Sequence, residues 1–248
     1  MSVKGAAAAD QDRSATALAD ASEARLLLAA EAAVAVGARI MRQGRSHIGA
    51  LIAKADRDFA TDVDLHIESA IKSSLATAAP TIPFLGEEEG GGTDPARARW
   101  VLDPIDGTIN FARGNSLCTI SLSLVVAGEP VLGIVDAPFL DERFIARQGG
   151  GAFLNGNPIT IFEVATLNEA IIGIADFKVG VGSEEANRVH LAVLARLAHV
   201  TAGLLLVREA GGSVYDYDGS PHSAASRYTI TTVPSLAKPI LEIVAESM

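Results

Sequence analysis

A run of nine residues, Trp100 to Thr108 (WVLDPIDGT), constrains the fold of this chain more than any other part of it. The run begins as a buried apolar strand, and Pro104 lacks the N–H that a strand ladder needs, so we expect the chain to turn there. Asp103 and Asp106 then project from one tight turn. Gly107 permits backbone angles that other residues resist, and a helix with free N–H groups is predicted to begin directly after it.

Composition excludes several classes of protein. The chain has 248 residues, 49% of them hydrophobic, which is enough for one large domain or two subdomains that share a core. The formal net charge of −10 argues against a nucleic-acid or anionic membrane partner. One cysteine, Cys118, excludes an internal disulfide and cysteine-rich zinc sites, and we expect it to be a small buried side chain. No signal peptide or membrane span is evident, so we expect a soluble, cytoplasmic protein.

The N-terminal part of the chain is predicted to be helical after a short tail. Residues 1–21 are rich in Ala, Ser and Asp without an apolar stripe, and we predict a mobile tail. A packing helix is predicted from Ser22 to Gln43, and a loop from about Ser46 to Ala60. A second helix is predicted from Thr61 to Leu75 by the spacing of its apolar residues.

The remainder predicts a sheet followed by alternating helices and strands. Runs rich in β-forming residues at Leu117–Val126, Val131–Asp136 and Arg143–Arg147 indicate an antiparallel sheet, and Asn155-Gly156 indicates a hairpin turn. We expect two subdomains in one layered α and β fold, residues 22–147 and 148–248. The later predicted elements are helices at Ser183–His199 and Ala202–Ala210, strands near Val214 and Tyr228–Val233, and a helix after Ser235.

Carboxylates gather at predicted strand ends and loop-helix junctions. The candidates are Asp58, Asp64, Glu87, Glu88, Asp103 and Asp106. Mg²⁺ prefers oxygen ligands and keeps waters and substrate phosphate oxygens in its shell, and two such ions can clamp the attacking and leaving oxygens of phosphoryl transfer. No P-loop, nucleophile elbow, HExxH motif or dinucleotide fingerprint offers another chemistry.

Simpler interpretations of these acids exist. Asp103 and Asp106 could be turn-forming residues whose side chains hydrogen-bond nearby N–H groups, as Asp beside Pro and Gly often does. Asp58 and Asp64 could be ordinary helix-start residues. We expect Glu88 to be a solvated loop charge rather than a ligand.

Four segments resemble successive signatures of one family. KADRDFATDVD (Lys54–Asp64), GEE (Gly86–Glu88), WVLDPIDGTINF (Trp100–Phe111) and AGLLLVREAGG (Ala202–Gly212) are similar to the motifs of the inositol monophosphatase family, in the same order. The resemblance spans about Ser22 to the C-terminus. It implies an αβαβα sandwich of the inositol monophosphatase and fructose-1,6-bisphosphatase type, usually a homodimer, that hydrolyses phosphate monoesters with magnesium and is sensitive to lithium.

The resemblance also implies roles for individual residues. Glu87, Asp103 and the Ile105 carbonyl would hold one Mg²⁺, and Asp103 and Asp106 would share a second. Thr108 with Glu87 would position the nucleophilic water for direct attack, and Ile105 to Thr108 would contact the substrate, with N–H groups at the helix start suited to phosphate. Two or three ions are expected in all.

Two further acids complete the implied site. Asp58 and Asp64 match family residues that support a further, weakly held metal or the water network, and we include Asp64 among the catalytic residues. Lys54 lies near the lysine of the same family loop.

One stretch departs from the family pattern. The family's GSAA-like segment, a strand pair and a Trp-Asp pair that completes the second metal site have no counterpart, and His199 falls where the metal-binding Asp belongs. A neutral imidazole is a poor ligand for Mg²⁺. Either a stretch is missing from this sequence between Val200 and Thr201, or the protein is truly shortened; we expect the first, because shortening would leave unpaired strand groups.

We therefore predict a Mg²⁺-dependent phosphomonoesterase that hydrolyses inositol 1-phosphate or a similar small polyol or sugar phosphate. Fructose 1,6-bisphosphate, histidinol phosphate and nucleotide 3′-phosphates are alternative substrates. A non-catalytic relative is the alternative if the C-terminal acidic segment is absent.

Overall fold

The computed structural model covers residues 1–248, of which the structure describes 4–45, 52–55, 58–88, 90–91, 98–166, 169, 201–216, 218–222 and 229–246. Its centre is an eight-stranded sheet, in which β3 runs parallel to β5 and the other neighbouring strands pair antiparallel. In spatial order its strands are β10 (Asn157–Ile159), β9 (Gly151–Leu154), β8 (Glu142–Arg147), β7 (Glu129–Ala137), β6 (Thr119–Val126), β5 (Arg99–Asp106), β3 (Phe84–Gly86) and β4 (Gly90–Gly91).

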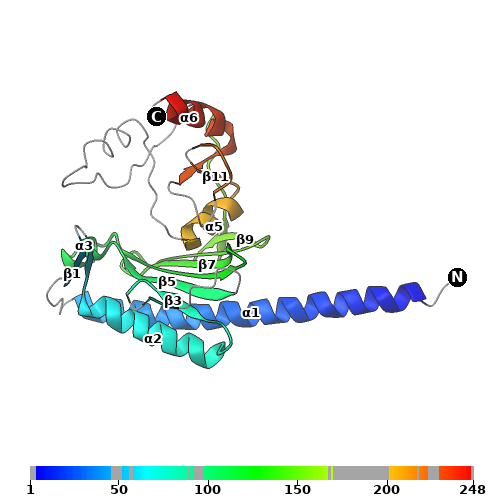
Figure 1. Ribbon diagram of the computed structural model, residues 1–248, viewed down its shortest axis with the longest axis horizontal. Coiled ribbons are helices and arrows are strands. Elements are labelled where there is room, and N and C mark those ends of the chain that lie inside the picture. Colours follow the sequence, from blue (N-terminus) through cyan, green and yellow to red (C-terminus); the bar gives the residue numbers. More distant parts are fainter. Residues whose placement is uncertain are drawn as a thin grey trace.

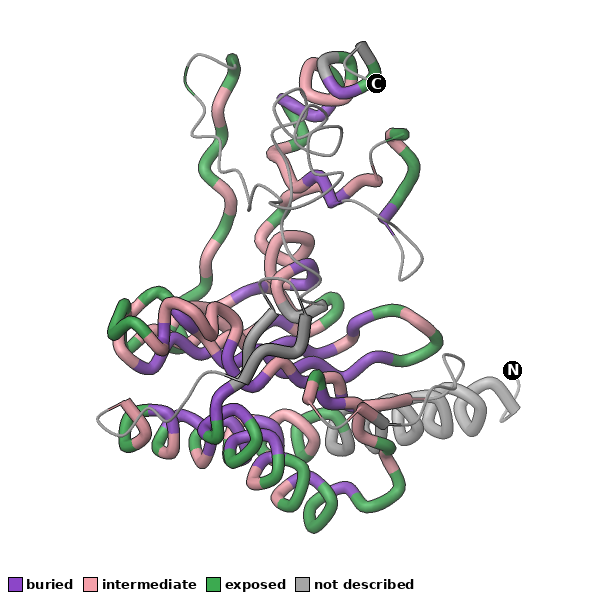
Figure 2. The backbone as a smooth tube through the Cα atoms, turned by 60° about the vertical axis from the view of Figure 1, so that its left-hand side comes forward, coloured by how far each residue is buried: buried purple, intermediate pink, exposed green. Residues whose placement is uncertain are grey.

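Two helices, α1 (Lys4–Gly44) and α2 (Asp62–Ala78), cover one face of this sheet (Figure 1). Alternate residues of β5 and β6 point toward them because successive side chains of a strand face opposite sides. The buried layer is purple in Figure 2. It contains Ala30, Val34 and Met41 of α1, Ile67 and Ile71 of α2, Trp100 and Leu102 of β5, and Ile120 and Leu122 of β6.

The opposite face is covered by the C-terminal part of the chain. Helix α5 (Thr201–Glu209) packs on β6 to β9, and Leu205 is buried against Ala146 and Ala152. Beyond α5 lie a two-stranded sheet, β11 (Ser213–Tyr215) and β12 (Ile230–Thr232), and then α6 (Pro234–Glu246) (Figure 1). The order helix, sheet, helix, sheet, helix confirms the predicted αβαβα layering.

Several boundaries differ from the predictions. Helix α1 begins at Lys4, so residues 4–21 are helical and the helix does not start at Ser22; the many alanines of this segment favour helix. The predicted loop before α2 contains a hairpin of β1 (Ile52–Ala55) and β2 (Asp58–Ala60). The predicted division after Arg147 falls inside the main sheet, because β9 pairs with β8. The helix predicted at Ser183–His199 lies outside the described residues, as does Val200 of the predicted break before Thr201.

Strand β5 does not end at Pro104. It continues to Asp106, and its pairing with β6 is irregular between Asp103 and Asp106. On its other side β3 pairs only as far as Leu102, so the missing N–H of Pro104 meets no partner strand there. The expected sharp turn is therefore a bulged strand end, and the helix start follows it.

None of the helices in the described part of the chain combines the length and the apolar character needed to cross a membrane.

Candidate active site

The irregular end of β5 leads directly into a short helix, α3 (Thr108–Ala112), as predicted. Gly107 precedes it with φ of +91°, a left-handed angle that disfavours side chains. A Cβ atom at Gly107 would also lie 3.0 Å from the Leu117 carbonyl oxygen. The Asn110 side chain donates to the same oxygen at 2.8 Å, so the loop after α3 is folded closely against its start.

Helix α2 brings a buried carboxylate to this point. Thr61 caps α2, and the Thr61 N–H donates to Asp64 Oδ2 at 2.8 Å in a capping box. The other carboxylate oxygen, Oδ1, lies 3.3 Å from Thr108 Oγ1, which is also 3.0 Å from the Ile105 carbonyl oxygen. Burial raises the pKa of Asp64, although its hydrogen bonds to Thr61 and Thr108 oppose the shift. Asp64 therefore completes the capping box of α2 and also lies beside Thr108.

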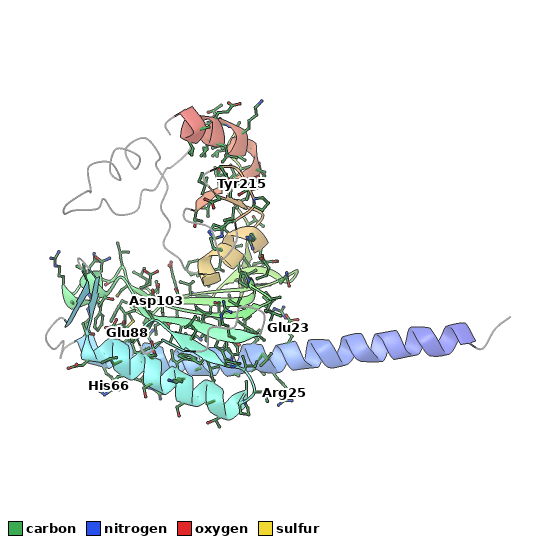
Figure 3. All side chains as sticks on the ribbon, viewed as in Figure 1. Glu23, Arg25, His66, Glu88, Asp103 and Tyr215 are labelled. Carbon is green, nitrogen blue, oxygen red and sulfur yellow. The ribbon has the colours of Figure 1, made fainter. Side chains whose placement is uncertain are left out.

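Three further acids join Asp64 to form what we call the carboxylate cluster: Asp64, Glu87, Asp103 and Asp106. Burial raises the pKa of Asp103 well above its usual range, and the charges of Glu87, Asp106 and Asp64 raise it further. The Glu87 carboxyl also lies close enough to Asp103 for a hydrogen bond, which raises the pKa of Asp103 further. Burial and the Glu87 charge likewise raise the pKa of Asp106. The cluster thus concentrates four carboxyl groups in one place, and Figure 3 labels one of them, Asp103, on the main sheet.

The donor atoms of this cluster fit a hard divalent cation. Asp103 Oδ1 is buried and accepts no hydrogen bond from the described residues. The carboxylates and the Ile105 carbonyl are the oxygen ligands that Mg²⁺ prefers, and a cation would offset the mutual repulsion that raises the pKa values. Among the described residues, no three acidic, histidine or cysteine side chains are already arranged around one point as metal ligands. The ligands would therefore have to turn toward an ion rather than receive it in a finished cage.

Glu68 is a residue of the site region that the sequence interpretation missed. It is fully buried on α2, one turn after Asp64, and Glu68 Oε2 accepts the Glu88 N–H at 2.9 Å. Glu88 thus contributes its backbone to the site region rather than a ligand, and its N–H fixes the turn that carries Glu87. The signal in the sequence was an acid four positions after Asp64, on a helix face that is otherwise apolar at Val63, Ile67 and Ile71.

Arg45 ties the end of α1 to the loop after α3. Its guanidinium lies 4.0 Å from the centre of the Phe139 ring and donates to Ser116 Oγ at 3.3 Å, and it also donates to the Gly114 carbonyl. This contact holds the loop that follows the candidate site.

The structure thus brings together most of the predicted site residues, namely Asp64, Glu87, Asp103, Ile105, Asp106, Gly107 and Thr108. Asp58 and Lys54 lie on β2 and β1, whose side chains are outside the described part, and His199 is also outside it. Cys118 is buried, as predicted.

Comparison with known proteins gives consistent matches. A model described as the inositol monophosphatase family matches residues 22–197. The chain is 36% identical over 227 residues to the probable inositol 1-monophosphatase ImpA of Mycobacterium tuberculosis, covering 77% of this chain and 84% of the relative. It is 31% identical over 216 residues to a protein of Thermotoga maritima named fructose-1,6-bisphosphatase/inositol-1-monophosphatase, with the same two coverages, 77% and 84%.

A solved structure shares the fold. The Thermotoga maritima IMPase superposes with a TM-score of 0.77 at 26% identity, covering 90% of this chain and 97% of that one. The alignment with the Mycobacterium tuberculosis relative extends over 227 residues but covers only 77% of the 248 residues of this chain. Part of the alignment therefore consists of residues of that relative that have no counterpart in this chain.

Proposed function

The chain belongs to the inositol monophosphatase family, and on this basis we propose that it is a Mg²⁺-dependent phosphomonoesterase for inositol 1-phosphate or a similar small polyol or sugar phosphate. The family and the named relatives support a phosphatase of this superfamily. The single observation that carries the finer proposal is the carboxylate cluster around Asp103, whose buried Oδ1 has no hydrogen-bond partner in the described part of the chain.

In the proposed mechanism Glu87, Asp103, Asp106 and the Ile105 carbonyl would hold the metal ions, two or three in number. Bound Mg²⁺ supplies positive charge for the phosphate oxygens and lowers the pKa of water. The protein holds these ligands on β5 and on the turn after β3, so their backbones are fixed before any substrate arrives.

Thr108 and Asp64 are suited to receive a proton from the attacking water. Because the Thr108 hydroxyl can donate toward Asp64 at 3.3 Å, its lone pairs remain available to accept a hydrogen bond from water. The raised pKa of Asp64 brings this carboxyl closer to the range in which a general base works at neutral pH. Direct attack by water needs no covalent phosphoenzyme, and we propose that Glu87 helps to position this water.

The substrate phosphate is proposed to contact the segment from Ile105 to Thr108. The first N–H groups of a helix have no acceptor within the helix, and those at Gly107 and Thr108 stand beside the carboxylate cluster.

Release of inorganic phosphate from inositol 1-phosphate in the presence of Mg²⁺ tests this function. We expect turnover by the wild type, and loss of turnover in Asp103→Asn because the amide cannot supply an anionic ligand. Asp218→Asn is the matched control, since Asp218 is an exposed turn residue that accepts the Ser220 N–H. Wild-type turnover in Asp103→Asn would refute the proposed site.

A non-catalytic relative is the second candidate. It is favoured by the sequence near His199, where the acidic residue that completes the family's second metal site has no counterpart. A screen with inositol, fructose, histidinol and nucleotide phosphates separates the two candidates. Absence of turnover with every monoester would favour the second candidate, and turnover of fructose 1,6-bisphosphate alone would reassign the substrate.

Homodimer formation, lithium sensitivity and a cytoplasmic location are further parts of the proposal that the family resemblance carries. Light scattering of the purified protein tests the dimer, and inhibition of phosphate release by Li⁺ tests the sensitivity.

A further inference from the structure

A buried serine on β6 is not explained by the fold. Ser121 is 3% exposed, and its Oγ has no hydrogen-bond partner among the described residues. A buried hydroxyl without a partner is unfavourable, so native proteins seldom keep one without another reason.

The position of Ser121 in the sheet suggests that reason. Ser121 lies directly opposite Asp103 in the antiparallel pairing of β6 with β5. Directly opposed residues point to the same face, with Cβ atoms about 4.5–5.5 Å apart. This face is the one away from α1 and α2, because the flanking Ile120 and Leu122 enter the core with those helices. The Ser121 hydroxyl, which has no acceptor among the described residues, therefore lies opposite Asp103. The Asp103 Oδ1 atom in turn has no donor among the described residues.

We infer that Ser121 is a positioning residue for the metal site, whose hydroxyl donates to the Asp103 carboxylate when Asp103 holds a metal ion. The inference rests on the proposed function. When Asp103 turns one carboxylate oxygen toward a metal ion, the other oxygen needs a hydrogen-bond donor, and Ser121 is placed to provide it. Such hydrogen bonds orient metal ligands and tune their affinity.

Binding of Mn²⁺, a paramagnetic substitute for Mg²⁺, tests the inference when it is followed by electron paramagnetic resonance on the full chain. We expect Ser121→Ala to weaken Mn²⁺ binding by about ten- to a hundredfold, the usual effect of removing such a supporting group. The melting temperature of the metal-free variant should be no lower than that of the wild type, since the substitution removes an unsatisfied hydroxyl. Ser121→Thr keeps the hydroxyl and should restore binding.

Ser123→Ala is the matched control. Ser123 lies on the same strand and the same face, is 1% exposed, and faces Val101 instead of an acid. We expect its Mn²⁺ affinity to equal that of the wild type. Wild-type affinity in Ser121→Ala would overturn the inference, as would an equal loss in Ser123→Ala. Asp103→Asn tests the metal site itself. If this variant also binds Mn²⁺ like the wild type, the proposed function fails. If Mn²⁺ binding is lost in Asp103→Asn but not in Ser121→Ala, only the role of Ser121 is overturned.

Discussion

Replacement of Gly86 by alanine should destabilise the protein through a contact with Glu68. A Cβ atom at Gly86 would overlap the Glu68 carboxyl group. Neither the Gly86 backbone nor the Glu68 side chain can move easily to relieve this overlap. Gly86 pairs with Leu102 of β5 and Gly90 of β4, while the Glu68 side chain is fully buried and accepts the Glu88 N–H at 2.9 Å. The carboxyl would have to leave its donor, and the turn that carries Glu87 would lose its support.

The cost can be worked out from these contacts. Overpacking a buried site costs about 1–3 kcal/mol, and losing a hydrogen bond to a charged acceptor costs about 1.5–3 kcal/mol. Alanine also lowers the conformational entropy of the unfolded chain, which stabilises the folded protein by about 0.4–1 kcal/mol and offsets part of this cost. We therefore expect Gly86→Ala to lower the free energy of unfolding by about 3 kcal/mol. With a urea m-value of about 2 kcal/mol/M, the urea midpoint would fall by about 1.5 M.

Urea unfolding of the metal-free protein measures this, and a double-mutant cycle identifies the cause. In a Glu68→Ala background the methyl group has room, so the cost of Gly86→Ala should fall below about 1 kcal/mol. Gly203→Ala on α5 is the control, because a Cβ atom there meets nothing within 4 Å and alanine favours helix by up to about 1 kcal/mol. An equal loss of unfolding free energy from Gly86→Ala with and without Glu68 would show that the Glu68 carboxyl is not the cause.

Three further predictions concern the same region. The raised pKa values of Asp64, Asp103 and Asp106 mean that the folded protein keeps protons that the unfolded chain releases near pH 3.8. The stabilisation from these bound protons is complete below that pH and is lost as the pH rises through the raised pKa values. Over that range the free energy of unfolding falls by up to about 1.4 kcal/mol per pH unit for each group. Urea unfolding of the metal-free wild type should therefore lose more stability between about pH 4 and pH 7 than that of Asp103→Asn, and an equal loss would contradict this. Gly107→Ala should lower the free energy of unfolding, measured in urea, by at least about 1–2 kcal/mol because of the left-handed backbone at this position. The loss should exceed that of Gly114→Ala, because Gly114 has a similar backbone angle (φ +77°) but an added Cβ atom there would meet nothing within 4 Å. Burial raises the pKa of the Cys118 thiol to about 11, so a thiol reagent at pH 8 should label it only after unfolding, and rapid labelling of the native protein would contradict its burial.

Local chemistry allowed much of the fold to be predicted from the sequence. Thr61 followed by Asp64 three positions later is a capping box, and α2 begins there. Gly107 marked the start of α3, and Asn155-Gly156 marked the hairpin between β9 and β10, where both residues have positive φ. These features depend on a few neighbouring residues, so they can be read without knowing the rest of the chain.

Errors arose where distant parts of the chain decide the outcome. Pro104 predicted a break, yet β5 continues through it because β3 ends opposite Leu102 and leaves the proline without a partner strand on that side. The boundary expected after Arg147 falls inside one sheet, because β9 returns to pair with β8. Strand pairing of this kind is a property of the whole sheet rather than of a segment.

The residues that carry the candidate chemistry can be identified from the sequence, since the WVLDPIDGT run and the GEE turn supply oxygen ligands in a recognisable order. The groups that support these ligands become visible only in the folded chain. The α2 helix brings Asp64 against Thr108 and Glu68 against the turn of Glu87, and the register of β6 on β5 places Ser121 opposite Asp103. Burial and the approach of like charges raise the pKa of Asp103, and both arise only when segments far apart in sequence are packed together.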